Sequence, residues 1–170
     1  MFFGWSSLYR YDVASGVITS LAPLVPDVVT LCWTDLTQDG AFAAGACGAA
    51  GEVIERDTQT GVDTVFPVLA DQGQAGAASH APLGTRMGYA NARGDPKNEA
   101  GQLVLVPARG EGPSLIASHA PGAFGRIEWI DEARMAVGYW EGDASFVDVV
   151  AVDGSRRAVG QGRLIGLMRR

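Results

Sequence analysis

The chain has 170 residues, of which 47% are hydrophobic and 19% are charged, and its net charge is −6 from 13 basic and 19 acidic residues. This composition is typical of a folded domain with a core, and the acidic balance argues against nucleic-acid binding, which needs a basic surface. No stretch approaches the roughly 18 apolar residues of a membrane-spanning helix. The 23 glycines and 8 prolines favour many short strands joined by turns.

The chain begins with a short apolar segment at residues 2–5, which predicts a strand. This start lacks the charged residues and the long apolar run of a secretory signal, so a complete chain would be cytoplasmic. A second strand is predicted at residues 8–11, where apolar and polar side chains alternate, and a third at residues 17–21. The turn between them runs from Asp12 to Gly16, residues that cap a turn and adopt a positive φ.

Three longer units follow, at about residues 26–70, 71–120 and 121–162, after a first unit at residues 1–25. Each unit contains a short strand, a tight turn, a strand of small apolar residues, a loop, a third strand, a second turn and a fourth strand. The first unit lacks the opening strand of the others. The tight turns and the third strands recur at matching intervals, at Gly40, Gly84 and Ala133 and at Tyr11, Arg56, Val106 and Val152. Four strands in about 45 residues match one blade of a β-propeller.

Residues 8–16, 80–89 and 129–138 resemble the TolB-like class of β-propeller repeats, which is related in pattern to WD-repeat propellers. That class carries a Trp-Ser-Pro-Asp-Gly turn and a strand ending near Tyr-x-x-Asp-x-x-x-Gly. Parts of this pattern remain in different units, as Asp39-Gly40, Pro82 and Trp129. The resemblance implies an all-β propeller fold and says little about function, because propellers host unrelated activities.

Residues 163–170 lie where the opening strand of a next unit belongs. This strand would complete the first blade and close a small four-bladed ring. Two other interpretations stay open: the chain is part of a larger propeller, or two copies form a homodimer that completes a larger ring. An open arc of blades would expose sheet edges and apolar faces.

The two cysteines, Cys32 and Cys47, would lie opposite each other in a hairpin centred on Asp39-Gly40. A disulfide between them is sterically conceivable, but two buried small residues are the favoured interpretation, and the sequence leaves the bridge open. The four tryptophans are expected to pack between blades: Trp5, Trp33, Trp129 and Trp140.

No catalytic, metal or cofactor residue can be assigned from the sequence. His80 and His119 occur in identical Ala-Ser-His-Ala-Pro segments, but they are out of phase with the repeat and are interpreted as histidines with satisfied hydrogen bonds, on a strand and in a loop. The acidic loop around Asp95, Asn98 and Glu99 is interpreted as solvated. The chain has no Gly-x-Ser-x-Gly motif for a nucleophile.

The sequence therefore predicts a non-catalytic propeller that binds a protein, a peptide or a small ligand through its loops, with no role in nucleic-acid or membrane binding. The alternative is the substrate-gating or accessory propeller of a larger enzyme, such as a serine hydrolase.

Overall fold

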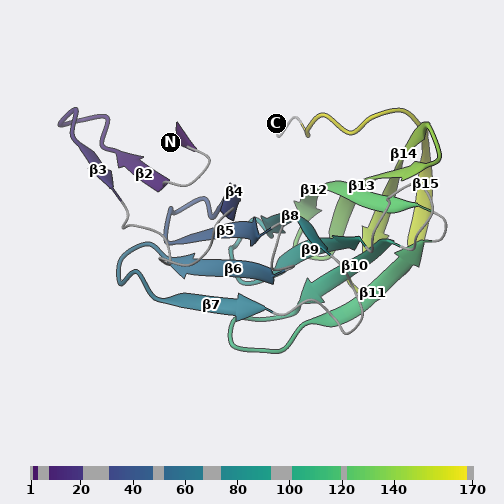
Figure 1. The fold of residues 1–170 in the computed structure, drawn as a ribbon, viewed down its shortest axis with the longest axis horizontal. Helices are drawn as coiled ribbons and strands as arrows, with labels where there is room; N and C mark the ends of the chain where they lie inside the picture. Colours follow the sequence, from purple (N-terminus) through teal and green to yellow (C-terminus); the bar gives the residue numbers. More distant parts are fainter. Residues whose placement is uncertain are drawn as a thin grey trace.

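The computed structural model describes residues 2–3, 8–20, 31–47, 52–66, 74–92, 101–119 and 122–167. Every element of regular secondary structure in these ranges is a β-strand, and the strands form four antiparallel sheets (Figure 1). Within each sheet the strands follow one another in chain order. These findings confirm the predicted all-β fold with four repeated units.

The first sheet has three strands and the others have four. Their bounds are β1 (Phe2–Phe3), β2 (Leu8–Tyr11) and β3 (Ile18–Ser20); β4 (Leu31–Leu36), β5 (Phe42–Cys47), β6 (Glu52–Asp57) and β7 (Asp63–Phe66); β8 (Gln74–His80), β9 (Met87–Ala92), β10 (Gly101–Val106) and β11 (Ser114–His119); β12 (Ala123–Asp131), β13 (Arg134–Glu141), β14 (Ala144–Ala151) and β15 (Arg156–Gln161).

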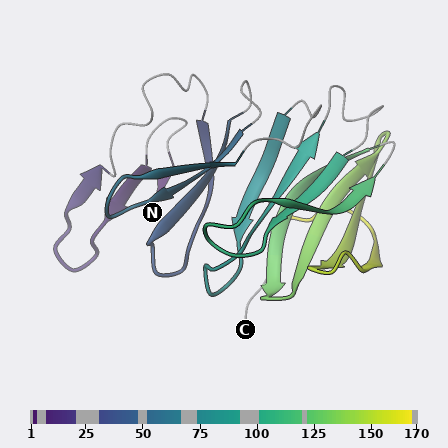
Figure 2. The same ribbon diagram turned by 90° about the horizontal axis from the view of Figure 1, so that it is seen from below.

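The four sheets stand side by side in an arc, and Figure 2 shows the same order of sheets from below. In Figure 1, β4, β8 and β12 lie on the inner side of the arc, and β7, β11 and β15 lie on its outer side. Strands β4 and β5 pack against β8, and strands β8 and β9 pack against β12. The opening strands of three units therefore meet along the inside of the arc.

Local turn chemistry explains where the strands end. Gly40 and Gly84 have φ values of 73° and 69°, and each closes a turn by donating its backbone N–H three residues back. The Asp57 carboxylate accepts backbone N–H groups from Thr60 and Gln59, and these bonds hold the pKa of this carboxyl below its usual value. Turns of this kind need only nearby residues, which is why their positions could be predicted.

The register differs from the predicted phase in the last unit. Ala43 pairs with Arg56, and Met87 pairs with Val106, as the predicted repeat requires. In the last sheet the residue that corresponds to Ala43 and Met87 is Ala136, and it pairs with Val149, three residues before Val152. Val152 itself lies one residue after the end of β14 (Ala144–Ala151), whereas Tyr11 and Val106 end their strands and Arg56 is the last residue but one of β6.

Two cores join the three four-stranded sheets. One core lies between the β4–β7 and β8–β11 sheets and includes Phe66, Tyr89 and Val104. The other lies between the β8–β11 and β12–β15 sheets, around Trp129, which is 1% exposed. Burial raises the pKa of Tyr89 to about 12.

The tryptophans divide into two groups. Trp33 and Trp129 are buried, as predicted. Trp140 is 37% exposed, so the prediction that it packs between blades is wrong. Trp5 lies outside the described residues.

The cysteines are not directly opposed. Next to the turn, Leu36 pairs with Ala43, in the predicted register. The register then shifts between Trp33 and Asp35, so that Cys32 pairs with Ala46 while Cys47 pairs with Leu31. The predicted pairing of the two cysteines is wrong because this irregularity displaces one strand by one residue.

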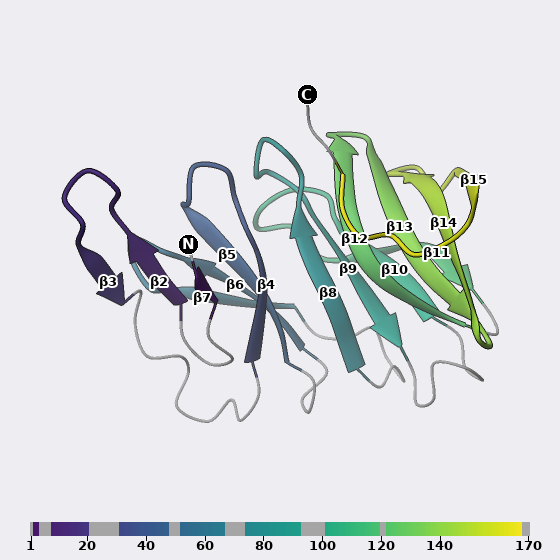
Figure 3. The ribbon, with the colours of Figure 1, turned by 90° about the horizontal axis from the view of Figure 1, so that it is seen from above.

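Residues 163–167 form no strand, so the strand predicted at 163–170 is wrong for these residues, and residues 168–170 lie outside the described part. The segment instead runs back over β13, where Leu164 lies against Gly138. Figure 3 shows it over the last sheet, while β1 to β3 stand at the other end of the arc. Among the described residues, no helix is long and apolar enough to cross a bilayer.

Candidate functional site

Three adjoining hollows follow the inner strands β4, β8 and β12. The first has a volume of about 260 Å³ and shares Asp35, Ser79 and Glu128 with the second, which has a volume of about 430 Å³. The second shares Ala77 and Arg126 with the third, also about 430 Å³. We call these hollows together the inner groove, lined by Gln38, Asp35, Ser79, Glu128, Arg126 and Trp140.

Charge is unevenly distributed along the inner groove. Asp35 and Glu128 lie in the part next to the turns that end β4 and β8. Arg126 and Arg163 lie in the part next to Trp140. Arg126 forms an ion pair of 2.6 Å with Glu128, so one bridge connects the acidic part of the groove to the basic part.

A buried ionic cluster supports the acidic part of the groove. The His80 side chain is 1% exposed, and its Nδ1 lies 3.1 Å from Asp35 Oδ2 while its Nε2 lies 3.1 Å from Glu55 Oε1. Arg109 forms an ion pair with Glu55 at 3.2 Å and donates a hydrogen bond of 2.7 Å to the carbonyl of Gly84. The cluster therefore joins strands β4 and β6 of one sheet to strand β8 of the next.

The pKa values of two groups in this cluster, His80 and Glu55, are shifted in the directions that favour their charged forms. Burial alone would lower the pKa of His80, but the hydrogen bonds with Asp35 and Glu55 outweigh it, so the pKa lies above its ordinary value. Burial would likewise raise the pKa of Glu55, but His80 and Arg109 hold it below its ordinary value. The imidazole is thus held between two carboxylates, which stabilise its protonated form.

This geometry gives His80 a structural role. Both ring nitrogens are engaged by carboxylates, so neither is available to accept a proton from a ligand in the groove. The prediction of a satisfied strand histidine is therefore confirmed for His80. His119 is the last residue of β11, not part of the following loop, and its side chain lies outside the described part of the structure.

Hydrogen bonds between sheets fix the walls of the groove. Thr34 Oγ1 donates to the carbonyl of Ala78 at 2.8 Å, and Trp129 Nε1 donates to the carbonyl of Ser79 at 2.8 Å. These bonds connect β4 to β8 and β8 to β12, so the groove is bordered by strands that are held in place from both sides.

Sequence reasoning did not identify the residues of this site. The one available signal is Glu55, an acidic residue that directly follows Val53 and Ile54 in β6 and is buried. Among the described residues, no group of three or more His, Cys, Asp or Glu side chains is placed to hold a metal ion. The acidic loop with Asp95, Asn98 and Glu99 lies outside the described ranges.

No family model matches the chain, and no curated protein matches it. Solved structures do. A TolB structure from Agrobacterium tumefaciens superposes with a TM-score of 0.65 at 14% identity, over 92% of this chain and 58% of that chain. The fold is a β-propeller fold.

Other propeller structures agree with this assignment. A nidogen/laminin complex superposes with a TM-score of 0.71 at 11% identity, over 96% of this chain and 63% of that chain. An oligogalacturonate lyase in complex with manganese superposes with a TM-score of 0.67 at 17% identity, over 90% of this chain and 46% of that chain. The chain thus spans about half the length of the propellers that it matches, and identities this low establish the fold alone.

Proposed function

We propose that this chain is a binding propeller whose inner groove holds an extended segment of a partner protein or a peptide. The observation that carries the proposal is the continuity of the groove across two blade junctions, from Gln38 to Trp140. A groove of connected hollows suits an elongated ligand better than a compact one.

The charges in the groove indicate which peptide would fit. Asp35 and Glu128 are partly exposed at the end next to the turns, and the His80 ring is buried behind them. A lysine or arginine of the partner would pair with these carboxylates. We therefore expect the bound segment to carry basic side chains near Glu128.

The rigidity of the groove also favours binding. Its walls are connected by the Thr34 and Trp129 hydrogen bonds and by the His80 cluster. A surface that is ordered before the partner arrives loses little conformational entropy on binding. His80 has no free ring nitrogen, and this is the reason to prefer binding over acid–base chemistry at that residue.

The test is a selection of displayed peptides on the purified chain, followed by affinity measurements on single variants. Glu128→Arg should weaken the selected peptides by about tenfold or more, because a favourable charge pair becomes a repulsion. Glu111→Arg is the matched control, since Glu111 is exposed in a turn and does not line the groove. The proposal would be contradicted if the affinity of the selected peptides is unchanged by Glu128→Arg, or if it falls equally with both variants.

A second candidate is the accessory propeller of a larger enzyme. It is favoured by the length comparison, because the chain spans 46% of an oligogalacturonate lyase with the same fold. A catalytic domain encoded in the same reading frame would support it, and the inner groove would then contact substrate on its way to that domain.

A further inference from the structure

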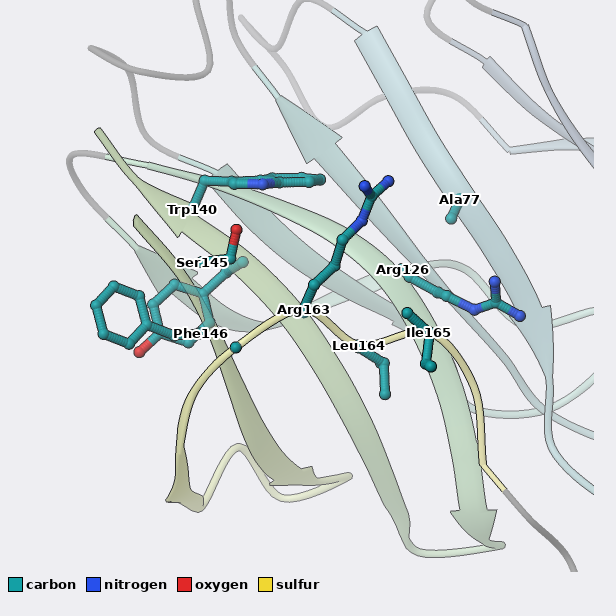
Figure 4. Close-up of a pocket in the computed structure, with 11 residues that line it drawn as sticks. Ala77, Arg126, Trp140, Ser145, Phe146, Arg163, Leu164 and Ile165 are labelled. Carbon is teal, nitrogen blue, oxygen red and sulfur yellow. The ribbon is translucent and has the colours of Figure 1, made fainter. Parts of the chain in front are cut away.

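The third hollow of the inner groove has features of its own. We call it the Trp140 pocket, and it is lined by Trp140, Arg126, Arg163, Ser145, Leu164 and Ile165. Its volume of about 430 Å³ lies in the range of small-molecule sites, which is about 300–1,000 Å³. Figure 4 shows side chains from β12, β13, β14 and the segment after β15 around one space.

The indole ring of Trp140 is held in place by the backbone of the neighbouring strand. A Cβ atom on Gly125 would lie 2.3 Å from Cη2 and 2.4 Å from Cζ3 of this ring. Only glycine leaves room for the ring at this position, so the ring lies directly against β12. Because Trp140 is 37% exposed, the rest of the ring offers a flat surface for stacking.

The guanidinium group of Arg163 lies next to this ring, and that of Arg126 lies farther along the pocket (Figure 4). Figure 4 shows the Arg163 side chain extending between Trp140 and Arg126. No described residue forms an ion pair with Arg163, whereas Arg126 pairs with Glu128. The pocket therefore carries an excess of positive charge on a protein whose net charge is −6.

The segment after β15 closes the remaining side. Leu164 Cβ lies 3.3 Å from the position of a Cβ atom on Gly138, so this segment lies close to β13. Leu164 and Ile165 add apolar surface next to the two guanidinium groups. The pocket thus combines a flat aromatic ring, an apolar wall and a cationic region.

We propose that the Trp140 pocket binds a small planar anion, an aromatic or heteroaromatic ring that bears a carboxylate or a phosphate. The ring stacks on Trp140, and the anion lies between Arg163 and Arg126. Guanidinium groups match carboxylate and phosphate oxygens with paired hydrogen bonds. This pocket is the end of the inner groove beyond Arg126, and its binding of a small anion does not require that a peptide binds at Asp35 and Glu128.

The experiment follows the indole N–H signal of Trp140 by NMR at low salt, with the signal assigned from Trp140→Phe. Four probes test whether binding needs both the planar ring and the anionic group. Adenosine monophosphate and benzoate carry both, adenosine carries only the ring, and inorganic phosphate carries only the anion. We expect saturable shifts with adenosine monophosphate or benzoate, and binding at least about tenfold weaker with the other two probes. The comparison of the first two probes distinguishes phosphate from carboxylate recognition.

Arg163→Gln should weaken binding by about tenfold or more, through loss of a charge-assisted hydrogen bond. Arg157→Gln is the matched control, because Arg157 is exposed on the same sheet and does not line the pocket. Both residues lie on the surface, so neither change should impair folding. The proposal is overturned if neither ring-bearing anion binds saturably, if adenosine binds as well, or if the two arginine variants weaken binding equally.

Discussion

Replacing His80 by leucine should weaken the junction between the second and third blades. Leucine is the chosen replacement because Leu36 occupies the equivalent position in the preceding unit. Leu36 pairs with Ala43 and His80 pairs with Met87, and each is the strand pair nearest the turn. The variant removes the two side-chain contacts of His80 and leaves Glu55, whose side chain is 7% exposed, with Arg109 as its cation. Asp35 is more exposed, so water replaces part of the lost interaction there.

The expected loss is about 2–4 kcal/mol at pH 6, because the buried contact to Glu55 accounts for most of it and the Asp35 contact for less. With a urea slope of about 2 kcal/mol/M, the unfolding midpoint should fall by roughly 1–2 M. Tryptophan fluorescence reports the transition, because one of the four tryptophans, the buried Trp129, bonds to the residue before His80.

The pH dependence of this loss has a definite sign. The pKa of His80 is raised in the folded chain above its value of 6.5, so its stabilisation is complete below pH 6.5 and disappears as the pH rises through the folded value. Glu55 has a lowered pKa, so its contribution is present above pH 4.5 and is lost as the pH falls through its folded value. The difference between wild type and His80→Leu should therefore be larger at pH 6 than at pH 9.

The pKa of His80 can be measured directly by NMR, because the chain contains only one other histidine, His119. In His119→Gln, the remaining imidazole signals belong to His80, and NMR titration gives its pKa. A value at or below 6.5, or an equal stability difference at pH 6 and pH 9, would refute the reasoning.

Two further predictions concern an ion pair within the second blade and two turns. Asp63→Asn should lower the free energy of unfolding in urea by about 3–5 kcal/mol. The reason is that Arg56 is 3% exposed and that its charge is compensated by two hydrogen bonds to Asp63, of 2.6 and 2.7 Å. The double variant Arg56→Met with Asp63→Leu replaces the ion pair by an apolar pair and should recover most of the lost stability. Gly84→Ala should destabilise more than Gly40→Ala, although both turns need a positive φ at a cost of about 1–2 kcal/mol. A Cβ atom on Gly84 would lie 2.9 Å from Thr37 Cγ2 of the neighbouring blade, whereas one on Gly40 meets nothing within 4 Å. Equal melting temperatures for these two variants would contradict the contact.

The strand order and most turns of this protein are determined locally, and they could be predicted for that reason. The segment from β6 to β7 illustrates this, because Asp57 and Gly61 form the turn with the backbone between them. A repeat with this local chemistry predicts a sheet of successive antiparallel strands wherever it occurs. The matching propeller structures confirm that level of description.

Contacts between units depended on the tertiary structure. His80 bonds to Asp35, 45 residues away, and to Glu55 in a different strand, and no periodic pattern specifies which side chains meet across a blade junction. The one-residue shift that separates Cys32 from Cys47 is likewise a property of paired strands. The repeat thus determined which blades form, while packing between them decided which charges are buried and where the inner groove lies.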